Sequence, residues 1–192
     1  MRVRLFLTLA LSACAASAWA NPVQSRQAND AAPVSTVFAA RVRVYVMLQK
    51  KLEGSLSAQK SSTEVERIAG RQEALARSVA AARRDARQGD IFAPDVAAHF
   101  RAIIREAFQG PDGKNMRRTI QEGDPEQATF LRVNAVYPEE IPLGTMPPML
   151  LRRLPVLPSE LAYRIIGRAL VLKDVKTNVI VDFMPDAIPR VP

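Results

Sequence analysis

His99 is the only histidine of the 192-residue chain, and its spacing from two carboxylates is the first arrangement that could support chemistry. Asp95 precedes it by four residues and Glu106 follows it by seven, so a helix would place all three near one line on its surface. Such a line could orient an imidazole or bind a metal ion weakly. We interpret His99 as a helix-surface histidine with a carboxylate neighbour. Asp95 and His99 remain the candidate metal ligands, and the sequence predicts no cofactor.

Paired carboxylates offer a second kind of chemistry, because two held close together can act as general acid and base or hydrolyse glycosides. The candidates are Glu122 with Asp124, Glu139 with Glu140, and Asp174 with Asp182. We interpret the adjacent glutamates as solvated loop charges, Asp174 as a turn former and Asp182 as an outward-facing polar residue of a strand. The alternative is a small carboxylate-dependent hydrolase in which His99 helps.

Composition and spacing exclude other familiar sites. One cysteine and one histidine can build neither an internal disulfide framework nor a common zinc site. No serine lies in a Gly-x-Ser-x-Gly elbow, and the turn 110–114 lacks the length and the preceding strand of a phosphate-binding loop.

The first twenty residues have the order of a secretory signal. Arg2 and Arg4 are followed by an uncharged apolar run, Leu5–Ala13, and then by Ala18-Trp19-Ala20, where small residues flank a bulky one. We therefore expect residues 1–20 to be a signal peptide that is cleaved after Ala20. The mature chain would lie outside the cytoplasm, in a bacterial periplasm.

The competing interpretation of this segment is a lipoprotein signal. Leu11-Ser12-Ala13-Cys14 resembles a bacterial lipobox, in which Cys14 would be lipidated and would anchor the mature chain to a membrane. The apolar run is shorter than the roughly 20 residues of a membrane-spanning helix, and no later stretch approaches that length. We expect no transmembrane helix in the mature chain.

The charge balance is strongly basic, with 27 Lys and Arg against 19 Asp and Glu, a net charge of +8 and a pI near 10.2. Because the chain is expected to be exported, nucleic acid is not its expected partner. The positive charge instead favours binding to anionic envelope surfaces or to acidic proteins. The candidate anion contacts are Arg83, Arg84, Arg87, Arg117 and Arg118. The first three are expected in the last turn of a helix, where the helix dipole favours cations.

Hydrophobic periodicity predicts that these residues are positioned by one α+β domain over residues 35–192, preceded by a flexible leader at 21–34. Residues 35–123 are predicted to form a small helical bundle. Its first helix, from Ser35, carries an apolar stripe: Val37, Phe38, Val42, Tyr45, Leu48 and Leu52. The alternation across 41–46 is also typical of a strand, but the stripe outlasts it, so we favour a helix for residues 37–52.

Three further helices are expected, from Thr63, from about Asp95 and over 115–122. The core face of the first of these three consists of Val65, Ile68, Leu75, Val79 and Ala82. Residues 124–160 are rich in proline and predict an irregular strap that lies over the bundle, with a segment docking on a partner as the alternative. Residues 161–184 predict a three-stranded antiparallel meander, with strands at 161–166, 169–173 and 179–183.

The runs Tyr163–Gly167, Leu170–Asp174 and Ile180–Asp182 resemble the C-terminal β-element of small exported bacterial proteins. Some of those proteins belong to the periplasmic nickel/cobalt-homeostasis accessory group. The resemblance implies the same compartment. It does not imply a metal site, because those families carry histidine-rich or strongly polar segments and this chain has one histidine.

Together these observations favour a non-enzymatic exported envelope protein that acts through contacts with a protein or an anionic surface. The alternative is the small envelope hydrolase. The sequence leaves the oligomeric state open.

The signal segment generates the first prediction. Expressed with its full N-terminus in a Gram-negative bacterium, the chain should be recovered with Asn21 as its first residue, and Cys14→Ser should leave processing unchanged. Intact-mass spectrometry of the purified protein checks both outcomes. A diacylglyceryl group on Cys14 would instead support the lipoprotein.

Overall fold

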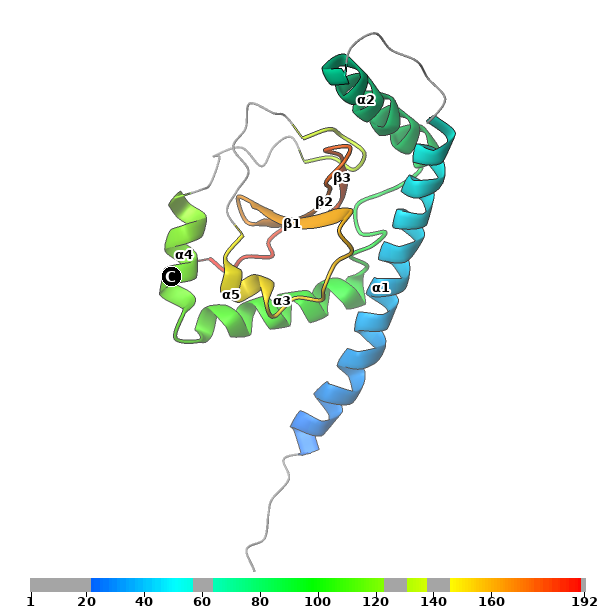
Figure 1. The fold of residues 1–192 in the computed structure, drawn as a ribbon. Coiled ribbons are helices and arrows are strands. Elements are labelled where there is room, and N and C mark those ends of the chain that lie inside the picture. Colours follow the sequence, from blue (N-terminus) through cyan, green and yellow to red (C-terminus); the bar gives the residue numbers. More distant parts are fainter. Residues whose placement is uncertain (1–21, 57–63, 123–130, 138–145, 191–192) are drawn as a thin grey trace, which may run out of the picture.

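The computed structural model describes residues 22–56, 64–122, 131–137 and 146–190 (Figure 1). The helices are α1 (Pro22–Leu56), α2 (Glu64–Ala82), α3 (Pro94–Gln109), α4 (Gly113–Glu122) and α5 (Pro148–Leu151). The strands are β1 (Leu161–Ile166), β2 (Ala169–Asp174) and β3 (Ile180–Met184). The expected α+β order, with helices first and a three-stranded antiparallel sheet last, is confirmed.

Helix α1 resolves the ambiguity between helix and strand in favour of the helix. It begins at Pro22 rather than Ser35, so residues 22–34 are helical where we expected a leader. Its buried face consists of Phe38, Val42, Tyr45, Val46 and Gln49. Val37, which we placed on this face, is 37% exposed instead.

Helix α2 ends at Ala82, so the arginines that we expected in its last turn lie beyond it. Leu75 and Val79 are buried as predicted. Ile68 is 58% exposed and Ala82 is also exposed, so the core face of this helix is narrower than the apolar pattern indicated.

The sheet has the order β1-β2-β3, with both pairs antiparallel. Leu161 pairs with Asp174 and Ile166 with Ala169 across a tight turn, in which Gly167 adopts the positive φ that a residue with a side chain rarely takes. An isolated bridge between Val136 and Val179 adds residues of the 131–137 segment beside β3.

Both faces of the sheet are covered, which explains why every residue of β2 is buried. One face, with Tyr163, Ile165 and Leu170, joins the helices in the main core. The other face packs against Tyr137 and Leu131 in a smaller cluster. The described part of the strap contains the short helix α5 and contributes Leu150 and Leu154 to the main core.

Four aromatic rings connect the helices to the sheet at the centre of the main core. Phe100 of α3 lies 4.9 Å from Phe38 of α1, 5.3 Å from Phe92 and 6.1 Å from Tyr163 of β1, measured between ring centroids. The centroid separations are those at which aromatic pairs attract each other beyond simple area burial. Phe100 is therefore the point where α1, α3 and β1 meet.

Several expectations fall on residues outside the described ranges. These are the signal segment 1–20 with Cys14, and the carboxylates Asp124, Glu139 and Glu140. Within the described ranges, no helix has the length and apolar character needed to cross a membrane.

The aromatic junction generates the second prediction. Phe100→Ala should lower the free energy of unfolding by about 3–5 kcal/mol, because Phe100 is fully buried and leaves a cavity between three elements. Urea unfolding followed by circular dichroism measures the loss. Val44→Ala on the exposed side of α1 is the control and should change stability by less than about 0.5 kcal/mol. Equal midpoints for the two variants would contradict the central role of Phe100.

Candidate functional site

Asp182 is fully buried on β3, so the expectation that it faces outwards is wrong. Its Oδ2 accepts hydrogen bonds from the backbone N–H groups of Ile91 and Phe92, both at 2.8 Å. Its Oδ1 accepts the N–H groups of Gly89 and Phe183, also at 2.8 Å. These four bonds give the buried carboxylate its hydrogen-bond partners, and the three from residues 89–92 tie the connection between α2 and α3 to the sheet.

Asp174, at the end of β2, is the second fully buried carboxylate. Its Oδ1 accepts the N–H groups of Lys176 and Thr177, which confirms the predicted turn-forming role. Its Oδ2 also accepts the Tyr45 hydroxyl at 2.6 Å and the Gln49 amide at 2.7 Å, both from α1. Burial, together with the charge of Asp174, raises the pKa of the Tyr45 hydroxyl, which therefore stays a neutral donor.

Arg83, which follows α2, makes its contacts inside the fold. Its guanidinium donates to Asn134 Oδ1 and to the carbonyl of Val181, both at 3.0 Å, and lies 5.0 Å from the centre of the Tyr45 ring. Burial lowers the pKa of Arg83, while Tyr45 and Asp182 act in the opposite direction. Arg83 therefore holds the loop after α2 against β3, and its guanidinium is engaged within the fold.

Two of the other arginines expected to contact anions, Arg84 and Arg87, are exposed on this loop. Arg84 lies beside Asp85 at 3.4 Å, and Asp90 accepts the backbone N–H of Arg87. The two exposed cations therefore share the loop with two carboxylates. The loop is rigidly anchored, but its exposed charge is close to balanced.

The remaining pair of candidate arginines is on α4. Arg117 donates to the carbonyl of Phe108 at 3.2 Å and lies over the Phe108 ring, so it caps the end of α3. Arg118 is exposed, with its guanidinium 3.4 Å from Asn115 Oδ1. The five arginines thus divide into two with internal contacts, Arg83 and Arg117, and three on the surface.

The helical spacing around His99 is present in α3, but its neighbours have other contacts. The His99 ring lies 6.4 Å from the ring of Phe100, and Glu106 accepts a hydrogen bond from Arg153 at 3.1 Å. Asp95 is exposed in the first turn of α3. Among the described residues, no three histidine, cysteine, aspartate or glutamate side chains gather as metal ligands would.

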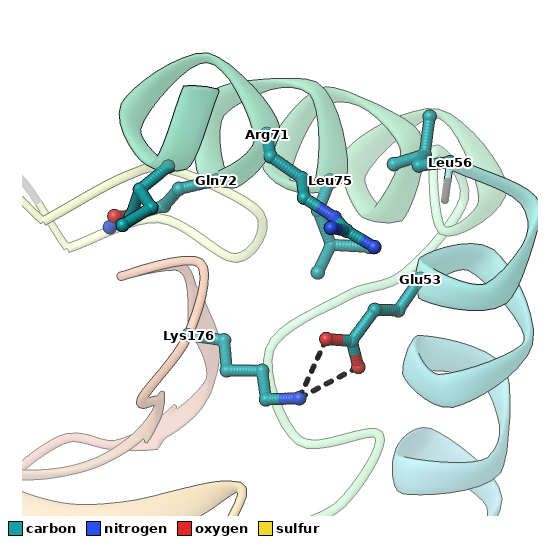
Figure 2. A pocket seen from close by; sticks show the side chains of 7 residues that line it. Glu53, Leu56, Arg71, Gln72, Leu75 and Lys176 are labelled. Atoms are coloured by element: carbon teal, nitrogen blue, oxygen red, sulfur yellow. Dashed lines mark hydrogen bonds and ion pairs between the residues drawn. The ribbon is translucent and has the colours of Figure 1, made fainter. Parts of the chain in front are cut away.

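A hollow of about 210 Å³ lies where the end of α1, α2 and the turn after β2 meet. Its apolar wall includes Leu56 and Leu75, and Lys176 donates to both carboxylate oxygens of Glu53 at 2.7 Å (Figure 2). Arg71 and Gln72 of α2 complete the side seen in Figure 2. Glu53 is engaged with a cation here, so the hollow presents an ion pair between α1 and the sheet rather than a pair of carboxylates.

A second hollow of about 320 Å³ lies between the strap and β1. Its lining is mainly apolar and includes Leu151, Val156 and Leu157, and Arg164 is its one ionisable side chain apart from the Tyr163 hydroxyl. That hydroxyl donates to the carbonyl of Pro155 at 3.1 Å. Among the described residues that line this hollow there is no carboxylate and no histidine.

The sequence pattern missed the outer face of α1. Val44 is 68% exposed and Met47 is 65% exposed, on the side of the helix opposite the buried Tyr45 and Gln49. Residues 34–52 contain four cations and no carboxylate. The strict alternation over 41–46 was the available signal, because a helix that alternates apolar residues in this way carries some of them on its outer face.

Asp182 generates the third prediction. Asp182→Ala should lower the free energy of unfolding by about 3 kcal/mol, because it leaves the buried N–H groups of Ile91 and Phe92 and the partly buried N–H of Gly89 without their acceptor. Asp85→Ala is the matched control on the same loop, since the Asp85 side chain is 93% exposed. Urea unfolding compares them. Equal stability of Asp182→Ala and the parent would contradict the anchoring role.

Comparisons with protein-family models, with curated proteins and with solved structures find no match to this chain. The resemblance of the β-element to small exported bacterial proteins therefore stays a prediction. The candidate site has to be argued from its own residues.

Proposed function

We propose that this chain is a non-enzymatic exported protein of the bacterial envelope, and that it acts by binding an acidic protein or an anionic surface. The observation that carries the proposal is the unbalanced positive charge on the outside of α1. Arg43 and Lys51 are exposed there, and no carboxylate occurs over residues 34–52. Export rests on the signal-like order of residues 1–20.

The contacts of the ionisable groups support a binding role over a catalytic one. Asp174 and Asp182 accept several hydrogen bonds each inside the fold, at separate places, one against α1 and the other against the 89–92 segment. The arginines with buried guanidinium contacts, Arg83 and Arg117, hold loops in place. The exposed cations Arg43 and Lys51 of α1 are available to a partner.

The fourth prediction concerns retention on the envelope. Purified protein should be retained on washed envelope fractions at low salt and released at about 0.5 M NaCl, because salt screens attraction between exposed charges. The double variant Arg43→Ala, Lys51→Ala should elute at lower salt, since it removes the two exposed cations of α1 that carry the proposal. Sedimentation of the fractions followed by immunoblotting measures retention.

Arg83 and Arg117 stay unchanged in this variant because their internal contacts would confuse binding with stability. The control variant Glu73→Ala, Asp85→Ala removes surface carboxylates and should raise the salt needed for elution. Retention that responds neither to salt nor to these substitutions would refute the electrostatic part of the proposal.

A further inference from the structure

The structure points to one docking surface, which we call the α1 seam: Val37, Ala40, Val44 and Met47. We infer that the α1 seam binds a helix of another protein that carries acidic residues beside its apolar stripe. This inference rests on the proposed function, because it names the kind of partner that the contact protein would bind.

The spacing of the α1 seam is that of a coiled-coil interface. Its members recur at intervals of three, four and three residues, which are the a and d positions of a heptad repeat. All four are exposed, Val44 at 68% and Met47 at 65%. The seam extends about 15 Å along the helix, at 1.5 Å per residue. A stripe this narrow fits one facing helix.

The opposite side of α1 is already occupied, which leaves the seam unpartnered. Phe38, Val42 and Tyr45 face the main core, where α1 contacts α2 and α3. In Figure 1, α1 runs along one side of the molecule and the sheet lies to one side of it. The apolar seam therefore has no function in the packing of the described residues.

The charges beside the seam select the partner. In the heptad frame that begins at Val37, Arg43 and Lys50 fall at successive g positions, and Lys51 follows at the next a position. Lys50 has an ion pair with Glu160 at 2.7 Å, whereas Arg43 and Lys51 have no ion pair among the described residues. Residues at e and g positions set partner choice, so cations here favour a helix with glutamate or aspartate at its flanking positions.

A second copy of the chain fits this surface poorly. A parallel copy would place Lys51 against its own counterpart, and an antiparallel copy would bring the flanks of Arg43 and Lys50 together.

An anionic bilayer also fits poorly. Helices that lie in a membrane interface present broad apolar faces with Trp, Phe or Leu, whereas this seam is narrow and consists of Val, Ala and Met.

The test uses a fluorescein-labelled synthetic peptide of about four heptads, with Val at a, Leu at d and Glu at e and g. The matched peptide has Lys in place of every Glu. Fluorescence anisotropy with the full chain should show saturable binding of the acidic peptide and at least about tenfold weaker binding of the basic one. Equal binding of the two peptides, or no binding of the acidic one, would overturn the inference.

Variants then locate the contact on the α1 seam. Val44→Asp with Met47→Asp should weaken acidic-peptide binding by about tenfold or more, and both positions are exposed enough to leave the fold intact. Arg43→Glu with Lys51→Glu should reverse the preference in favour of the basic peptide. The matched control is Val156→Asp with Arg152→Glu, at exposed positions outside α1, and should bind as the parent does. Loss of binding in this control alone would place the contact elsewhere.

Two further measurements separate other occupants. In sedimentation equilibrium, the protein alone should have the same oligomeric state as Met47→Asp. An association of the parent that Met47→Asp abolishes would mean that a second copy covers the seam. Vesicles of phosphatidylglycerol should bind the parent and the uncharged variant Met47→Gln equally, and a difference between them would mean that the seam binds a lipid surface. If salt-sensitive envelope retention persists while the acidic peptide fails to bind, the proposed function survives and this inference fails. If the peptide binds but retention ignores salt, the reverse holds.

Discussion

The buried carboxylate of Asp182 is the interaction on which the rest of the fold depends. It joins β3 to the 89–92 segment through three backbone N–H groups from a segment about ninety residues earlier in the chain. The desolvation cost of a buried carboxylate is large, and only several good donors offset it. This bonding fixes where α3 begins, and α3 carries Phe100 into the centre of the main core.

Asp174 and Arg83 extend the same arrangement to α1 and to the loop after α2. Asp174 accepts two hydrogen bonds from α1 and two from its own turn, so it sets the position of α1 along the end of the sheet. Arg83 then links the Tyr45 ring, Asn134 and the Val181 carbonyl. Polar groups with directional bonds thereby position helices that apolar packing alone would allow to slide.

The order of elements was predictable because it depends on local periodicity, and the helical bundle followed by three strands is confirmed. The burial of Asp182 was not predictable. A strand aspartate looks the same in sequence whether it faces water or three N–H donors, and those donors belong to residues about ninety positions away. For the same reason the sequence predicted Arg83 to be a surface cation, although its guanidinium binds Asn134 and the Val181 carbonyl of β3.

The two faces of α1 show why an apolar pattern alone does not define the core. Val42 and Val44 are the same residue type two positions apart, yet Val42 is buried and Val44 is 68% exposed. A two-residue step rotates about 200° around a helix, so Val42 faces the main core and Val44 faces away from it. An isolated exposed valine needs no explanation. Four apolar residues in heptad spacing, beside cations that form no ion pair with any described residue, do need one. α1 therefore has one face set by the folding of this chain and a second face that suits the chemistry of a partner.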